Sequence, residues 1–407
     1  MTVEQTFPTP DETTLRNSDL DSLMNMLQTQ HTEKLDFVAP AAKIRAEEGL
    51  IIVSGAEAEL TEDGVTRVDG TYRPTSTFLN GLAGKLDVPV GYLKRIHRDR
   101  PDLFDANVNG WLQGARAKTR LSGGEHQLIR PAVEGMDRSF LMRTFRGEDG
   151  PGLGRAFLSE HYKMLDNIDA LMAMLDGITK AGVEVDIRGC DLTESRMYVR
   201  IRAQEIKAYA PALLKGYRSP FSGAEGDANP TVFAGFVISN SEVGGGAFTI
   251  APQLVVQVCD NGLTITKDIR KTIHRGGLLG DGLIRWSDET RRQEIDLLRS
   301  KTADAVRTFL DVDYVTRTIE TLEKTATKPL NQAADKVVRT VGKKLAFSED
   351  QITGILAHFV KGGQTNAGGV LQAVTSYAQI IRETGSADTA NEVEAQGVRA
   401  MELAAAM

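Results

Sequence analysis

Apolar and polar residues follow two different periods along the chain. From about residue 36 to residue 265 the apolar runs are short and are bounded by Gly, Asn and Asp, which is typical of β-strands. After about residue 287 apolar residues recur with helical spacing. We therefore predict an α+β fold, with an antiparallel β-rich N-terminal and central region followed by a C-terminal helical region.

The clearest strand lies at residues 196–203, where the two faces alternate without interruption. The apolar face consists of Met197, Val199, Ile201 and Ala203, and the other face of Arg196, Tyr198, Arg200 and Arg202. A helix is predicted before this strand, with an apolar stripe made of Ile168, Leu171, Met172, Leu175 and Ile178. We expect both apolar surfaces to face the protein core.

Changes in the pattern divide the chain into four predicted regions. The first is a polar acidic arm on which little of the fold should depend, and the second is a small mixed region that holds a helical hairpin. A central β-rich core and a C-terminal helical region follow. In the same order, these regions span residues 1–35, 36–146, 147–286 and 287–407.

Composition narrows the class of protein. The 407 residues, 41% of them hydrophobic, suffice for two or three domains with their own cores. The apolar runs are shorter than the roughly 20 residues of a membrane span, and the N-terminus is polar and acidic, unlike a signal peptide. We expect a cytoplasmic protein that binds no membrane. Its two cysteines, Cys190 and Cys259, should be reduced thiols, and we expect no metal site and no cofactor.

Charge is distributed unevenly along the acidic chain, whose net charge is -7. Residues 1–70 hold 14 Asp/Glu and 5 Lys/Arg, whereas residues 71–146 hold 13 Lys/Arg and 7 Asp/Glu. A basic segment inside an acidic protein can attract a polyanion, although a solvated surface would give the same pattern.

The basic segment contains a candidate helix-turn-helix at residues 77–96. With Ala83 as the small residue of the first helix, four apolar residues fall where that motif buries side chains: Leu86, Val88, Leu93 and Ile96. Asp87 stands where glycine is usual, and helical hairpins without a role in DNA binding share this pattern. Basic residues Lys94, Arg95 and Arg98 follow the turn.

Two further basic clusters indicate contact with nucleic acid. The polar face of the strand at residues 196–203 alternates guanidinium and aromatic groups, which could follow a phosphate backbone and stack a base. The second cluster follows the predicted Asp260-Asn261-Gly262 hairpin turn and consists of Lys267, Arg270, Lys271 and Arg275. Ion pairing with neighbouring carboxylates and a solvated loop are the respective alternatives. The glycines after Arg275 match neither the P-loop nor the dinucleotide-binding motif.

Cys259 and His274 are weak candidates for a catalytic pair. A nucleophilic thiol needs a base within hydrogen-bond reach, and His274 lies near glycines in a predicted loop. A small buried thiol at the end of a strand explains Cys259 equally well, and nothing in the spacing fixes a contact with His274. We therefore predict a structural role for Cys259.

Four segments, in this order, resemble a known family. They are "RAFLSEHYKMLDN", "ISNSEVGGGAF", "VCDNGLTI" and "NAGGVLQAVTSYAQ". Together they resemble the phage/plasmid-like family of unknown function numbered 932, over about residues 70–385. This chain has Cys-Asp-Asn-Gly where the family usually has Cys-Ser-Asn-Gly, and a helix start at residues 366–369 that departs from the family's Thr-Trp-Gly. The resemblance implies carriage by bacteriophages or mobile elements and no established reaction.

These observations favour a non-enzymatic, nucleic-acid-associated protein of phage replication or recombination, with single-strand annealing or protection as candidate roles. Its expected partner is single-stranded DNA or RNA, and its C-terminal helices could form a homo-oligomer. The alternatives are a Cys/His-dependent enzyme and a structural module for protein interactions.

Overall fold

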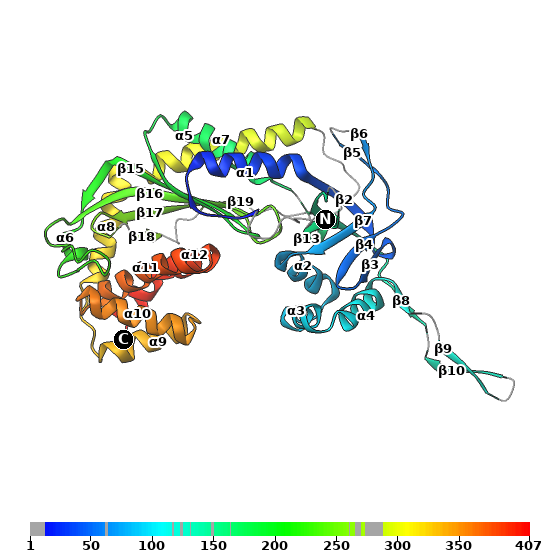
Figure 1. Ribbon diagram of the computed structural model, residues 1–407. Helices are drawn as coiled ribbons and strands as arrows, with labels where there is room; N and C mark the ends of the chain where they lie inside the picture. Colours follow the sequence, from blue (N-terminus) through cyan, green and yellow to red (C-terminus); the bar gives the residue numbers. More distant parts are fainter. Residues whose placement is uncertain are drawn as a thin grey trace, which may run out of the picture.

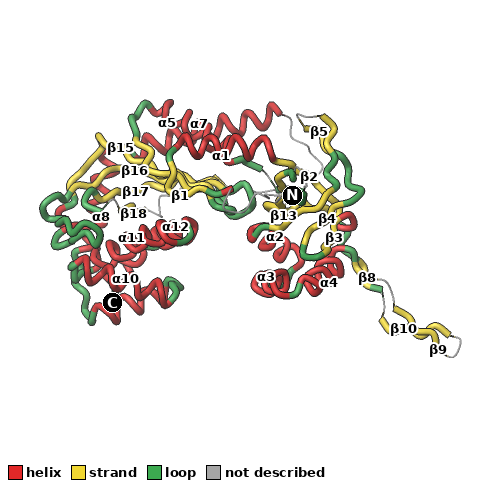
Figure 2. The backbone as a smooth tube through the Cα atoms, viewed as in Figure 1, coloured by secondary structure: helices red, strands yellow, loops and turns green. Residues whose placement is uncertain are grey.

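The computed structural model in Figure 1 has two lobes joined side by side. It describes the following residues: 13–61, 64–115, 118–122, 125–130, 132–147, 150–162, 164–259, 261–264, 270–272 and 288–407. The N-terminal lobe, residues 34–162, contains a six-stranded sheet, and the C-terminal lobe contains a seven-stranded sheet with helices on both faces. Figure 2 shows the strands of the two sheets as two separate groups.

The six-stranded sheet of the N-terminal lobe has the order β2-β12-β13-β7-β4-β3. All its neighbours are antiparallel except β13 and β7. Its strands are β2 (Lys34–Pro40), β3 (Ile44–Glu47), β4 (Leu50–Val53), β7 (Gly70–Pro74), β12 (Ser139–Phe145) and β13 (Gly152–Ser159). The helices of this lobe are α2 (Ser76–Leu86), α3 (Val90–Asp99) and α4 (Pro101–Leu112).

Short strand pairs extend from the N-terminal lobe. The chain after α4 forms β8 (Gly114–Ala115) and returns as β11 (Val133–Glu134), with β9 (Lys118–Ser122) and β10 (Glu125–Arg130) paired beyond them. This hairpin projects away from both lobes in Figure 1. A second small pair joins β5 (Glu59–Thr61) to β6 (Gly64–Thr66).

The seven-stranded sheet is antiparallel, with the order β1-β14-β15-β16-β17-β18 and β19 also paired to β17. Its strands are β1 (Leu15–Ser18), β14 (Asp186–Leu192), β15 (Met197–Tyr209), β16 (Thr231–Asn240), β17 (Phe248–Val256), β18 (Asn261–Thr264) and β19 (Arg270–Thr272). The α+β class and the order of β-rich and helical regions are as predicted.

Helices cover both faces of the seven-stranded sheet. One face carries α1 (Leu20–Glu33), α5 (Asn167–Ala181) and α7 (Asp288–Phe309), and the opposite face carries α11 (Ala367–Thr384) and α12 (Ala387–Ala395). The remaining helices of the lobe are α6 (Pro211–Leu214), α8 (Val312–Ala326), α9 (Ala334–Lys344), α10 (Glu349–Gly362) and α13 (Gly397–Ala405). Ser348 and Gln351 form a capping box at the start of α10, with both of its hydrogen bonds present.

The predicted apolar face of β15 is buried in the core, as expected: Met197, Val199 and Ile201 are at most 1% exposed. The stripe predicted for α5 is partly wrong, because Met172 is 43% exposed whereas Ala170, Ala173 and Met174 are fully buried. The reason is that α5 packs against both the sheet and α7, so its buried surface is wider than one stripe.

The prediction of a dispensable arm is wrong for residues 13–35. Strand β1 pairs with β14, and α1 buries Leu23 and Leu27 completely or nearly so against the sheet. The boundary predicted at residue 146 is also wrong. It separates β12 from β13, which pair as neighbouring strands of one sheet. The first error arises because a polar average hides a few apolar residues, and the second because strand pairing does not follow changes of pattern along the chain.

Candidate nucleic-acid interface

Helices α2 and α3 form a helix-turn-helix whose core positions are those predicted. Ala83, Leu86 and Leu93 are at most 2% exposed, Ile96 is 6% exposed, and Val88 packs against the same core. Asp87 occupies the position where glycine is usual and adopts the left-handed conformation, with φ 55°. Aspartate tolerates this conformation better than most residues, so the departure from glycine is compatible with the turn.

Neighbouring elements hold this motif rigidly in the lobe. Helix α4 packs against both α2 and α3 and buries Phe104 and Val108. Gly81 lets α2 lie directly on β13, since a Cβ there would come within 2.4 Å of the Phe157 carbonyl oxygen. The His97 ring, packed edge-on against Phe104, forms a 3.0 Å hydrogen bond through Nε2 with the Gly49 carbonyl.

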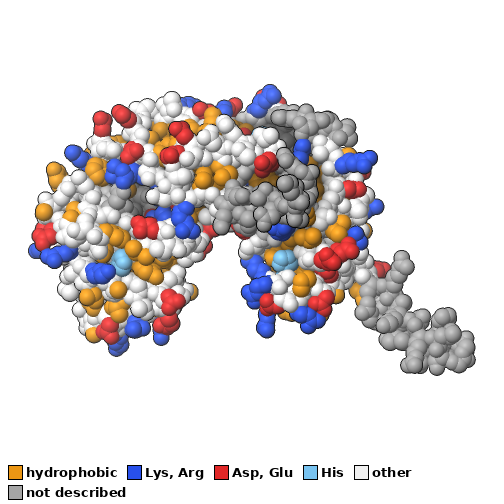
Figure 3. Space-filling view, in the orientation of Figure 1, with side chains coloured by type: hydrophobic (Ala, Val, Ile, Leu, Met, Phe, Trp, Pro, Cys, Tyr) orange, Lys and Arg blue, Asp and Glu red, His pale blue; other side chains and the backbone are white. Residues whose placement is uncertain are grey.

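The outer face of α3 is basic and exposed. The side chains of Arg95 and Arg98 are 79% and 76% exposed. Tyr92, which precedes them in the first turn of α3, is 45% exposed. Lys94 donates to Ser76 Oγ at 2.6 Å. Blue side chains gather over α3 on the side that faces the other lobe (Figure 3).

Local carboxylates balance part of this charge. Arg98 pairs with Asp99 at 2.7 Å, and Arg95 lies 4.0 Å from the same carboxylate. Hydrogen bonding from Arg98, the largest effect, lowers the pKa of Asp99. Ion pairs this exposed contribute little to stability, so phosphate groups can replace the aspartate at small cost.

The polar face of β15, predicted to bind nucleic acid, lies beneath helices. Tyr198 is 5% exposed, and the pKa of its hydroxyl is raised by burial and by the charge of Asp388 on α12. Arg196 instead donates from Nε to the Gly245 carbonyl at 2.8 Å. The expectation that this face is open to solvent is therefore wrong, because α11 and α12 cover it.

The two remaining arginines of this face are structural partners. Arg200 ion-pairs with the fully buried Asp191 and donates to Asn17 Oδ1 at 2.9 Å. Arg202 lies 3.5 Å from Asp186, with its guanidinium 4.9 Å from the centre of the Phe233 ring. Each arginine side chain is 12% exposed. Neither offers a free guanidinium to a nucleic acid in this conformation.

The polar face of the sheet continues into α11 and α12 as a buried network. Arg382 donates to Glu394 Oε2 at 2.8 Å and lies 3.9 Å from Asp191 Oδ2. Glu394 also accepts a hydrogen bond from Gln253 of β17. The network therefore joins β14, β15 and β17 to the helices above them. Arg382 itself is 8% exposed, so it is not a surface charge.

The second predicted basic cluster is only partly described. Arg270 and Lys271 belong to β19, where they pair in register with Ile250 and Thr249 of β17. Lys267, His274 and Arg275 lie outside the described residues. The predicted roles of this cluster in phosphate binding stay predictions.

Cys259 is a buried thiol at the end of the β17 segment. It is 8% exposed and belongs to the main core of the C-terminal lobe, and its carbonyl accepts a 3.0 Å hydrogen bond from Gln379. The other cysteine, Cys190, is fully buried, and burial raises the pKa of its thiol to about 11. Low exposure disfavours Cys259 as a nucleophile, in agreement with the structural role predicted for it.

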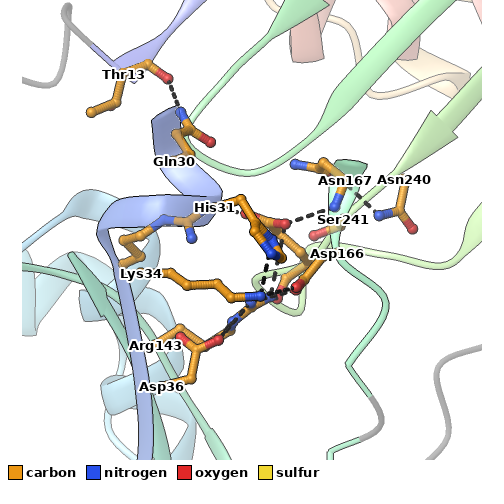
Figure 4. Close-up of polar contacts among 12 residues, drawn as sticks. Thr13, Gln30, His31, Lys34, Asp36, Arg143, Asp166, Asn167, Asn240 and Ser241 are labelled. Carbon is orange, nitrogen blue, oxygen red and sulfur yellow. Dashed lines mark hydrogen bonds and ion pairs between the residues drawn. The ribbon is translucent and has the colours of Figure 1, made fainter. Parts of the chain in front are cut away.

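A buried charge cluster joins the two lobes (Figure 4). Arg143 of β12, 1% exposed, donates to Asp36 at 2.7 Å and to Asp166 at 2.6 Å, and Lys34 donates to the other oxygen of Asp166 at 2.7 Å. Burial alone would raise the pKa of Asp166, but the charges of Arg143 and Lys34 outweigh it and hold this pKa well below its usual range.

The same cluster reaches the turn after β16. Arg143 donates to the Glu242 carbonyl at 2.7 Å, and the Glu242 carboxylate pairs with Arg155 of β13 while accepting from the backbone N–H of Asn167 at 2.8 Å. Three carboxylates and three cations thus neutralise one another across the junction. Among the described residues no group of acidic, His or Cys side chains is arranged to hold a metal ion. We infer that the cluster holds the two lobes in a fixed arrangement.

No protein-family model, curated protein or solved structure matches this chain. The resemblance to the family numbered 932 and a homo-oligomer through the C-terminal helices therefore stay predictions. Within the described part of the chain, no helix has the length and apolar character needed to cross a membrane.

Proposed function

We propose that this protein binds double-stranded DNA through α3, as a non-enzymatic accessory protein of phage or mobile-element replication or recombination. The observation that carries the proposal is the exposed basic face of α3 on a fully packed helix-turn-helix. The context of phages and mobile elements comes from the family resemblance alone.

The dimensions of α3 suit this role. A helix of 10 residues is about 15 Å long, and the major groove of B-DNA, about 12 Å wide, admits an α-helix. In helix-turn-helix proteins the second helix enters the groove while the first crosses the backbone. Lys94 and Arg95 stand four and three residues before Arg98, so the three cations lie on one broad side of α3, which would contact phosphates or base edges.

Duplex DNA suits this site better than the single strands expected from the sequence. The single-strand prediction depended on Tyr198 as a stacking group, and that ring is buried. A rigid helix with three cations and one exposed tyrosine matches groove binding more closely than a stacking platform, which requires several aromatic rings along a groove. Single-stranded DNA and RNA are retained as comparison ligands in the test.

The test is a fluorescence-anisotropy titration with labelled duplex DNA, single-stranded DNA and RNA at about 50 mM salt, where phosphate contacts are strong. The variant carries Lys94→Glu, Arg95→Glu and Arg98→Glu. Its matched control reverses three exposed arginines that also pair locally with carboxylates: Arg218→Glu, Arg292→Glu and Arg399→Glu.

We expect the α3 variant to bind the duplex more weakly than the wild type, and the control to bind it as the wild type does. For every phosphate that the α3 side chains neutralise in the wild type, the log-log salt dependence of the variant's affinity should be shallower by about 0.9. The proposal is contradicted if the wild type binds no duplex, if it prefers single strands, or if the two variants lose affinity equally.

A further inference from the structure

A second exposed basic surface lies on the C-terminal lobe, in and before α9. Residues 324–344 contain six Lys/Arg and one acidic residue, although the whole chain has a net charge of -7. We call the six basic residues the α9 ridge: Lys324, Lys328, Lys336, Arg339, Lys343 and Lys344. All six are exposed.

The packing of α9 fixes the direction of these side chains. Val337, Val338 and Val341 are buried, and a Cβ at Gly342 would come within 2.5 Å of Ile352 Cγ1, so α9 lies tightly against α10. The basic residues therefore occupy the opposite, outer side of the helix. The apolar pattern of this region predicts a helix but indicates no function. The excess of basic residues over residues 324–344 does indicate a site for a polyanion.

Most of the ridge charge has no local counter-ion. Arg339 lies 3.7 Å from Glu349, in a pair whose side chains are 49% and 71% exposed. Among the described residues, no carboxylate lies within ion-pair distance of Lys336, Lys343 or Lys344. The ridge lysines are therefore more available to an external anion than Arg95 and Arg98 of α3, which lie beside the Asp99 carboxylate.

The ridge and α3 lie at corresponding ends of the two lobes. In Figure 1, α9 and α3 are found at the lower ends of the lobes, on either side of the space between them. The space-filling view shows this space as an open hollow, with Lys and Arg side chains, and Asp and Glu side chains among them, at the ends of both lobes (Figure 3). The charge cluster around Arg143 holds the lobes, and hence the two basic helices, in this arrangement.

We propose that the α9 ridge is a second contact for the phosphate backbone of the same DNA duplex, which lies across the ends of both lobes. The inference rests on the proposed function of α3 and extends it. Lysines contact phosphates as point charges and carry no sequence information, so the ridge would add affinity while α3 sets position on the duplex. Two linked contacts on one ligand can exceed either affinity by about 10²- to 10⁴-fold.

The experiment compares two lengths of duplex. A duplex of about 10 bp spans one helical turn, about 34 Å, and offers one groove to α3, whereas a duplex of about 30 bp spans about three turns and, under the proposal, extends from α3 to the ridge. The ridge variant carries Lys336→Glu, Lys343→Glu and Lys344→Glu, and a milder variant replaces the same lysines by Gln. Thermal melts verify that each variant is folded, and the α3 variant is measured in parallel.

We expect the ridge variant to bind the long duplex at least about tenfold more weakly than the wild type and the short duplex equally well. The Gln variant should show a smaller loss in the same pattern. The α3 variant should lose affinity for both lengths.

Other outcomes separate the two proposals. The ridge proposal is overturned, and the function of α3 stands, if the ridge variant binds the long duplex as the wild type does while the α3 variant does not. Equal losses on both lengths would contradict the two-lobe arrangement. Unchanged binding by the α3 variant would overturn the proposed function itself. If the wild type binds polyglutamate and does not prefer the long duplex to the short one, the ridge proposal is overturned. The ridge would then be a binding surface for an acidic protein segment.

Discussion

The outer face of α3 and the polar face of β15 carry the same kinds of side chain but lie in opposite environments. Each places arginines beside a tyrosine at regular spacing, yet Arg95 and Arg98 are more than three-quarters exposed while Arg200 and Arg202 are 12% exposed. The difference arises because α11 and α12 cover one face of the seven-stranded sheet, whereas the described helices leave the outer side of α3 open. Basic residues in a regular pattern therefore serve binding or internal pairing according to what packs above them.

The largest effect should follow from breaking the covered network. Replacing Arg382 by Ala removes the ion pair of Glu394, which is 2% exposed, and one of the two guanidinium groups near the fully buried Asp191, whose pair with Arg200 remains. Loss of one partner from a buried ion pair costs about 3 to 5 kcal/mol. Urea denaturation should show a loss of this size, whereas Arg95→Ala on α3 should change stability by less than about 0.5 kcal/mol. Similar losses for the two variants would contradict the contrast between the faces.

A second test concerns α1 on the opposite face of the same sheet. Leu23→Ala should destabilise the protein by about 2 to 5 kcal/mol, because a fully buried leucine is truncated and leaves a cavity. Asn25→Ala, two residues along on the exposed side of α1, is the control. Equal melting temperatures for Leu23→Ala and the wild type would contradict this account and indicate that residues 13–35 are a dispensable arm.

Cys259 gives a smaller effect. Cys259→Ala should cost about 1 to 2 kcal/mol, the value for losing a small buried group. In the native wild type, iodoacetamide at pH 7 should label Cys259 more slowly than a free thiol, because the side chain is 8% exposed. Faster labelling than a free thiol would revive the enzyme alternative.

The smallest expected effect is a pH dependence from His358. This ring is 8% exposed, and its Nδ1 forms a 2.8 Å hydrogen bond with Ser376 Oγ. Burial and, less strongly, Lys361 lower the pKa of His358 in the folded state below its ordinary value of 6.5. As the pH falls below 6.5, the unfolded chain takes up the proton first, so folding is disfavoured.

Chemical denaturation between pH 7.5 and 5.5 should therefore show a steeper loss of stability for the wild type than for His358→Gln. Parallel pH profiles for the two proteins would show that His358 is not responsible.

Local pattern was enough to predict several parts of this structure. The alternation of β15, the five core positions of the helix-turn-helix and the α+β order depend on residues close in sequence, and each is found as predicted. Whether the polar face of β15 is exposed or covered depends on helices that begin more than 150 residues later, at Ala367. No local pattern could have indicated that cover. The basic α3 residues were visible as candidates, whereas the α9 ridge required the charge balance of one segment to be compared with that of the whole chain.

The most direct test of this contrast uses two exposed tyrosines, one on each element. Tyr92 on α3 is 45% exposed and Tyr209 at the end of β15 is 72% exposed, so either should accept p-benzoylphenylalanine without disturbing the fold. After irradiation with labelled duplex DNA, we predict a crosslink from position 92 and none from position 209. A crosslink from position 209 alone, or none from position 92 under conditions where the duplex is bound, would contradict the assignment of α3 as the DNA-binding surface.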